Sequence, residues 1–185
     1  PENIDDIEGC RRELGLRVDD YDGTGGTATF GADASMGQKM LAASYNASDR
    51  STDATTLDVA ARLWRPITDD LTWRVTLAQK SRAPFYLEWF QWLPSGSSAG
   101  LADGNVYLGD QSLDPEVALI AETGFDYVTE TAYIRPTVYI RQIDDFIQGT
   151  PFDDTPGVVD SMEEMMASMH GSSAVLLRFT NVEAR

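Results

Sequence analysis

The chain has 185 residues, of which 42% are hydrophobic, so it is long enough for a sizeable folded domain and too apolar for wholesale disorder. Its 30 acidic and 14 basic residues give a net charge of −16, which argues against nucleic acid as a partner because phosphate backbones bind basic surfaces. A single cysteine and a single histidine exclude an internal disulfide framework and any metal site that needs two histidines.

The sequence contains no run of about 18 apolar residues, so no transmembrane helix is expected. The first residues, Pro-Glu-Asn, show neither the charged nor the apolar part of a signal peptide, and none is expected in these residues. The chain is therefore a cytoplasmic protein, a mature chain or an internal fragment, and composition does not choose between these three.

Apolar and polar residues alternate with a period of two along much of the chain, which is typical of β-strands. In 12–21, for example, Leu14, Leu16 and Val18 share one face, and charged residues occupy the other. The predicted strands are 12–21, 25–35, 55–65, 71–81, 117–128, 132–149 and 174–185. The expected fold class is therefore all-β, an antiparallel meander of about seven long strands.

The connections between these strands alternate in length. The stretches 22–25, 66–70 and 129–131 are short enough for hairpin turns. The long loops are 36–54, 82–116 and 150–173. Short turns on one side and long loops on the other are expected of a transmembrane β-barrel. A soluble sheet also alternates apolar and polar residues, so a soluble β-sandwich stays open as an alternative.

The stretch 133–149 is long for a strand and has two contrasting faces. Ile134, Val138 and Ile140 share the apolar face, and arginines and tyrosines share the other. We expect the part up to residue 141 to span lipid, and 142–149 to rise into an external loop. Pro136 has no N–H to donate, so we expect it near the rim of the sheet, beside the short turn.

The second half of the chain contains four distinctive phrases. They are Ser81-Arg82-Ala83-Pro84; Gly104-Asn105 followed by Leu113, Pro115 and Glu116; Glu122 with Gly124; and Arg135, Pro136, Tyr139, Arg141, Asp145, Ile147 and Gly149. In order and spacing these phrases resemble the TonB-dependent receptors of Gram-negative outer membranes. The ending 178–185 is also similar to a strand of that family. The resemblance covers 12–185 and is strongest over 77–149.

The resemblance implies a plugged barrel of 22 strands, of which this chain holds only about seven. The plug domain, the motif that contacts TonB and the closing strands are absent, so we expect a fragment from the later part of the barrel. Alone it would have two open edges, which a bilayer does not tolerate. The implied function is import of a scarce ligand (siderophore, cobalamin, saccharide or metal) across the cell outer membrane with TonB-coupled energy.

The implied partners are outer-membrane lipid, the TonB system through missing parts of the parent protein, and a small-molecule or metal-chelate ligand. The polar strand faces would line the barrel lumen, through Arg17, Arg62, Arg74, Glu122, Arg135, Tyr139 and Arg141. We expect no enzyme activity, no catalytic residues and no cofactor, because His170 has no context for a nucleophile–base–acid set. The alternative function is a soluble or surface β-sandwich that binds a ligand or glycan.

Two loop features are candidate binding sites, and each has a structural alternative. The first holds five aromatic residues that form either the floor of a ligand pocket or a small core over the barrel mouth: Phe85, Tyr86, Trp89, Phe90 and Trp92. The second has methionines at helical spacing followed by a histidine: Met162, Met165, Met166, Met169 and His170. Thioethers and imidazole suit Cu(I), but a methionine face is usually adaptable packing. Ser161 or Asp160 would cap this predicted helix.

Overall fold

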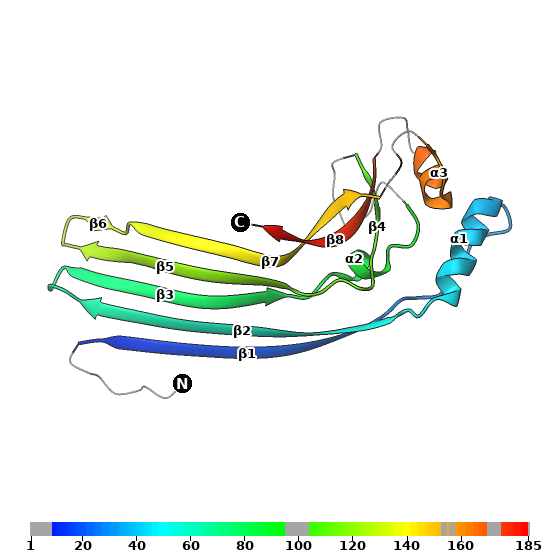
Figure 1. Ribbon diagram of the computed structural model, residues 1–185. Coiled ribbons are helices and arrows are strands. Elements are labelled where there is room, and N and C mark those ends of the chain that lie inside the picture. Colours follow the sequence, from blue (N-terminus) through cyan, green and yellow to red (C-terminus); the bar gives the residue numbers. More distant parts are fainter. Residues whose placement is uncertain (1–8, 95–103, 153–154, 156–157, 170–174, 185) are drawn as a thin grey trace.

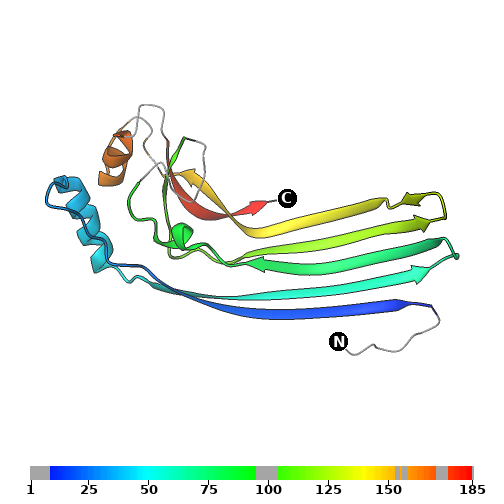
Figure 2. The ribbon, with the colours of Figure 1, turned by 180° about the vertical axis from the view of Figure 1, so that it is seen from behind.

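The protein is described by a computed structural model over residues 9–94, 104–152, 155, 158–169 and 175–184. One curved, single-layered sheet runs through the structure, and the helices gather at one end of it (Figures 1 and 2). The long strands are β1 (Arg11–Thr24), β2 (Ser51–Pro66), β3 (Leu71–Arg82), β5 (Glu116–Val128), β7 (Thr137–Pro151) and β8 (Leu176–Ala184). The short strands are β4 (Val106–Leu108) and β6 (Tyr133–Ile134). The helices are α1 (Met36–Ala47), α2 (Tyr86–Phe90) and α3 (Met162–Ser168).

The strands lie in the order β1-β2-β3-β5-β7-β8-β4, and β6 pairs with β5. The long strands pair antiparallel with their neighbours, whereas β4 runs parallel to β8. The predicted all-β antiparallel meander is confirmed. Among the described residues, none of the helices combines the length and the hydropathy that crossing a bilayer would require.

The predicted strand 25–35 is wrong, because these residues form an irregular segment under α1. The side chain of Asn46 accepts from the Ala28 N–H at 2.9 Å and donates to the Ala28 carbonyl at 2.8 Å. The Gly25 N–H donates to the Arg50 carbonyl at 2.7 Å. The Asn46 side chain in α1 and the Arg50 carbonyl after it thus satisfy backbone groups of this segment without a neighbouring strand. The first connection is therefore long, and the long strands are joined by long and short connections in strict alternation.

The predicted strand 132–149 is broken once and carries one bulge. Arg135 and Pro136 separate β6 from β7, so Pro136 lies beside the short turn as expected. Within β7 the pairing passes from one neighbour to the next: residues 137–144 pair with β5, whereas Ile143 and residues 146–151 pair with β8. Asp145 forms the bulge between them with a φ of 55°. The end of β7 thus leaves β5 and continues as a strand paired with β8.

Gly124 permits the break at Pro136. The Phe125 N–H still donates to the Pro136 carbonyl, at 3.2 Å. A Cβ on Gly124 would collide with that carbonyl oxygen and would lie 3.2 Å from the Cα of Thr137. The strand β5 therefore needs a glycine at this point, because any side chain would push the proline segment off the sheet.

The register of the sheet separates one apolar face from one polar face. A row across the apolar face contains Leu14, Ala61, Leu77, Ala121 and Ile140. The neighbouring row across the other face contains Glu13, Arg62, Thr76, Glu122 and Tyr139. The large apolar side chains of the first face are exposed, with Ile140 at 72%. This sheet therefore presents a wide apolar surface that no second layer of the described chain covers.

Buried side chains gather instead where the sheet meets the helices. The main cluster contains Ala54, Ala83, Trp89, Phe90, Tyr107, Leu113, Ile147 and Phe179. A second cluster joins β4 and β8 to α3 and contains Val106, Leu108, Ala167 and Leu176. The core of this chain thus lies in its long connections, which makes the loop end a packed platform.

Candidate functional site

The aromatic helix α2 packs on the polar side of the sheet. Gly23 of β1 and Ala54 of β2 lie on the same face as Arg62, by the strand register. A Cβ on Gly23 would lie 3.0 Å from the ring of Phe90 and 3.3 Å from that of Trp89, and Ala54 shares their buried cluster. The aromatic loop therefore folds inward over the end of the polar face.

The five predicted aromatic residues divide into two groups. Trp89 and Phe90 are 5% and 3% exposed and belong to the main buried cluster, which is the small core expected from the sequence as the alternative. Ligand contact by these two residues stays a prediction. Phe85 and Tyr86 are 65% and 53% exposed. Trp92 is half-buried between Phe30 and Tyr45.

Phe85 and Tyr86 lie at the edge of an open cavity of about 710 Å³. The other aromatic wall is formed by Tyr107 and Phe179, whose rings stack with centroids 5.0 Å apart. Ligand sites for small molecules span roughly 300–1,000 Å³ and are lined mostly by apolar and aromatic groups. The size and lining of this cavity fit that class of site.

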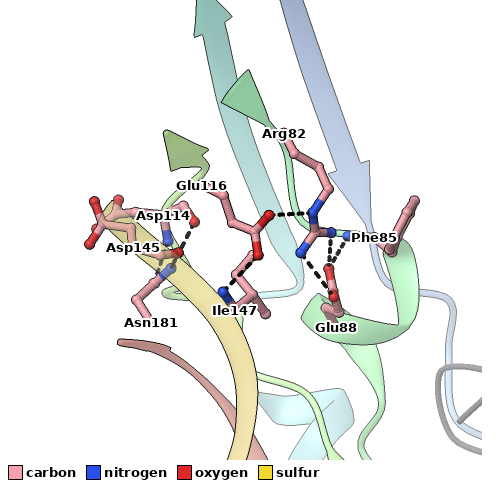
Figure 3. A network of polar contacts seen from close by, with 8 residues as sticks. All are labelled: Arg82, Phe85, Glu88, Asp114, Glu116, Asp145, Ile147 and Asn181. Carbon is pink, nitrogen blue, oxygen red and sulfur yellow. Dashed lines mark hydrogen bonds and ion pairs between the residues drawn. The ribbon is translucent and has the colours of Figure 1, made fainter. Parts of the chain in front are cut away.

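A network of ion pairs fixes this aromatic edge to the strands (Figure 3). Arg82, the last residue of β3, donates to Glu116 at 2.8 Å and to Glu88 at 2.8 Å. Glu88 also accepts from the Phe85 N–H at 2.7 Å, and the Arg82 guanidinium lies 4.9 Å from the Phe85 ring centroid. Glu116 accepts from the Ile147 N–H at 2.8 Å. One arginine therefore joins β3, α2, β5 and β7.

A second part of the network is centred on Asn181 of β8 (Figure 3). Its side-chain oxygen accepts from the Asp114 N–H at 2.8 Å. Its amide nitrogen donates to the Asp114 and Asp145 carbonyls at 3.0 and 2.7 Å. These contacts hold the loop before β5 and the bulge of β7 against β8. The distinctive phrases of the sequence thus meet in space, because Arg82, Glu116 and Asp145 belong to three of them.

Sequence reasoning missed Glu88 and Asn181 as partners in this network. Glu88 stands three residues after Phe85, the spacing at which a carboxylate returns to a helix N-terminus, and this spacing was an available signal. Asn181 had no such signal, because its partner Asp114 is 67 positions away.

We expect the network to make folding stability dependent on pH. Burial raises the pKa of Glu116, but the hydrogen bonds from Arg82 and the Ile147 N–H lower it more, so the pKa lies below its ordinary 4.5. A carboxyl group shifted downward stabilises the fold above the unfolded-state pKa, and this contribution is lost as pH falls through the folded-state pKa. The denaturant concentration at the unfolding midpoint should therefore fall between pH 7 and pH 3, and it should fall more in the wild-type parent receptor than in its Glu116→Gln variant. Parallel pH profiles of the two proteins would contradict this role.

The predicted lumen-facing residues share the polar face, and three of them meet. Arg74 donates to Glu122 at 2.6 Å and to Asp126 at 3.0 Å, and it also contacts the hydroxyl of Thr137. Arg135 joins the same cluster through Asp126, at 2.8 Å. Asp126 and Thr137 were not among the residues predicted to face the lumen.

The other members of that set lie apart from this cluster. Arg62 pairs with Glu13 at 3.2 Å, and Arg17 pairs with Asp19 at 2.6 Å. Tyr139 and Arg141 are exposed. The strand register places these residues on one face, and Arg135, which lies outside the strands, joins them through its ion pair with Asp126. That this face lines a lumen stays a prediction.

The methionine stretch forms helix α3 as predicted, and Ser161 caps its start. Met166 is buried, Met162 is half-buried, and Met165 and Met169 are exposed. His170 lies outside the described residues. Within the described ranges, no three side chains of His, Cys, Asp or Glu are grouped so as to hold a metal ion.

Comparison with known proteins adds a family and a fold. The sequence matches the family model "TonB dependent receptor-like, beta-barrel" over residues 11–185. No curated protein matches the chain. Among solved structures, the copper transporter OprC is similar with a TM-score of 0.58 and 18% identity, over 96% of this chain and 22% of that one. The siderophore receptor PirA from Acinetobacter baumannii is similar with a TM-score of 0.50 and 12% identity, over 98% and 31%. The chain thus spans less than a third of each structure.

Proposed function

This chain belongs to the TonB-dependent receptor β-barrel family, and we propose that it supplies wall strands and ligand-capturing loops to an outer-membrane receptor that imports a scarce ligand with TonB-coupled energy. The parent receptor would supply the remaining strands, the plug and the contact with TonB. Receptors of this family are transporters, so no enzymatic reaction is proposed. The location we propose is the outer membrane of a Gram-negative cell.

The observation that carries this proposal is the contrast between the two faces of one sheet. Leu77, Val138 and Ile140 are 55%, 73% and 72% exposed on the apolar face. A water-soluble domain buries the apolar side of a sheet under a second layer. Lipid chains would cover this face in a barrel, and the opposite face would meet water in the lumen.

The alternative of a soluble β-sandwich is wrong for the fold, because the described strands form a single sheet. A sandwich requires two sheets packed face to face. The apolar hollow lined by Val59, Leu77 and Leu119 lies on the exposed apolar face, so we assign it to lipid contact instead of ligand binding.

For ligand capture, the cavity edged by Phe85 and Tyr86 supports binding of a small molecule or a metal chelate. It lies at the loop end, and the Arg82 network fixes its wall. Rigid support of binding side chains lowers the entropy lost when a ligand binds. The similar structures are named as a copper transporter and a siderophore receptor, and both ligand classes are included in the proposal.

Cell fractionation tests the location. We expect the parent receptor in the outer-membrane fraction, with an electrophoretic mobility that changes on heating, as folded barrels show. Growth under limiting copper, ferric siderophore, cobalamin or oligosaccharide then tests import. At least one of these nutrients should require both the receptor and TonB. Recovery of the receptor as a freely soluble monomer would overturn the proposal, as would normal growth on all four nutrients without it.

A further inference from the structure

All six methionines of the chain lie on two neighbouring helical segments. Met36 and Met40 belong to α1, and the other four occupy 162–169 in and directly after α3. These helices come from different long connections, and they lie side by side in both ribbon views (Figures 1 and 2). Two loops of the proposed receptor thus place all the methionines on helical segments that lie beside one another.

Gly37 is the point at which the two helices approach. A Cβ on Gly37 would lie 2.8 Å from the sulfur of Met162 and 3.5 Å from the sulfur of Met166. It would also lie 3.3 Å from the terminal methyl of Met165. Two sulfurs therefore converge on the space that glycine leaves open. Met40 stands three residues after Gly37 and so lies on the same side of α1.

The exposure of these methionines distinguishes a binding role from packing alone. A methionine stripe that only fills a core is buried. Here Met36, Met40 and Met169 are 74%, 54% and 65% exposed, and Met166 alone is below 9%. Several methionines near half-buried Met162 and buried Met166 are thus exposed, so their sulfurs are accessible to a solute.

The chemistry of these donors selects a class of ligand. Thioether sulfur is neutral and soft, so it favours Cu(I) over hard cations such as Mg²⁺ or Ca²⁺, which prefer oxygen. The net charge of −16 adds a long-range attraction for cations without providing a binding geometry.

We propose that Met162 and Met166, with Met40 of α1, form a thioether site that captures Cu(I) between the two loops. The role in import rests on the proposed function, since these loops lie at the ligand-facing end of the barrel. Binding itself can be measured without transport, so failure of the site and failure of the import proposal can be told apart.

The test is a competition assay on the purified parent receptor in detergent, with Cu(I) kept reduced by ascorbate and a colorimetric Cu(I) chelator as competitor. We expect Met162→Leu/Met166→Leu to weaken Cu(I) binding at least tenfold, because leucine keeps the packing volume and removes both sulfurs. Met36→Leu is the matched control on α1 and should change affinity less. Equal affinity of wild type and double variant would overturn the site, as would absence of Cu(I) binding to the wild type.

Gly37→Ala provides a second test that keeps all six sulfurs. The added Cβ would displace the Met162 sulfur, so Cu(I) affinity should fall although the thioether count is unchanged. Heat-modifiable migration of each variant checks that the barrel is folded. Unchanged affinity in a folded Gly37→Ala receptor would contradict the proposed convergence, whereas outer-membrane location and TonB-dependent growth would still report on the import proposal.

Discussion

Ile140→Arg is expected to destabilise the parent receptor by about 2–4 kcal/mol and to lower its yield in the outer membrane. Ile140 is 72% exposed and lies in the apolar row with Leu77 and Ala121. In water, a substitution at such an exposed position changes stability by only about 0.5 kcal/mol. Leu77 and Ala121 lie midway along β3 and β5, so in the proposed barrel this row would lie near the middle of the bilayer, where an arginine would lose its hydration. Unfolding in urea from lipid vesicles measures the difference.

The adjacent residue gives a matched control. Tyr139 is 70% exposed, but it lies in the polar row with Glu122. Tyr139→Arg should therefore change stability by less than about 1 kcal/mol, since a lumen-facing arginine stays hydrated. Equal effects of the two substitutions would show that the faces do not meet different solvents, and the barrel orientation would have to be abandoned.

Arg74→Met is expected to destabilise the receptor by about 1–3 kcal/mol, because it removes the cation that two partly buried carboxylates share. The side chain of Arg74 is 8% exposed and contacts Glu122 and Asp126 from the neighbouring strand β5. Without it, these two carboxylates repel one another, and Arg135 alone remains beside Asp126. Urea unfolding of the parent receptor in lipid vesicles again measures the effect.

Arg62→Met is the control for this prediction, because it lies on the same face and also pairs with a carboxylate. Arg62 and Glu13 have side chains that are 47% and 48% exposed, so water screens their interaction. An exposed pair contributes about 0–1 kcal/mol. If both substitutions cost the same, burial does not decide the strength of these pairs.

The two faces of the sheet were predictable from sequence, because side chains on a strand alternate with a period of two. The alternation around Leu14, Leu77 and Ile140 places these residues on one face whatever the loops do. The short turns at 66–70 and 129–131 were predictable as well, since each joins two adjacent antiparallel strands. The predicted turn at 22–25 is wrong, because β1 continues to Thr24 and a long connection follows it. Alternation alone did not identify the solvent at each face, which is why the sandwich alternative stayed open.

The segment 25–35 shows where alternation misleads. Its apolar positions are mostly alanine between glycines and threonines, so burying them as a strand would contribute little free energy. A side chain of α1 hydrogen-bonds the backbone of this segment instead. A helix signal was present in the sequence: Ser35 and Gln38 form a capping box at the start of α1. A local rule based on caps would have found α1 where periodicity favoured a strand.

The packed platform at the loop end could not be predicted, because its contacts depend on the paths of several loops. Strand β4 pairs in parallel with β8, far along the chain, and three residues carry too little pattern to reveal it. Trp89 and Phe90 of α2 pack closely on Gly23 of β1, a residue far away in the sequence whose missing side chain leaves room for their rings. The Arg82 and Asn181 contacts likewise join segments that only the folded sheet brings together.

Because long and short connections alternate, the long loops all lie at one end of the sheet and the short turns at the other. Each long connection leaves one strand and returns on its neighbour in the sheet, while the short turns at the opposite end fix the register. An insertion or deletion above the sheet therefore need not shift any strand, and lengthening a loop adds little closure entropy. Selection can thus rewrite the external surface while the wall beneath it stays constant. Because the proposed thioether site lies between two loops, α1 and α3 would have to be transplanted together to transfer it to another barrel.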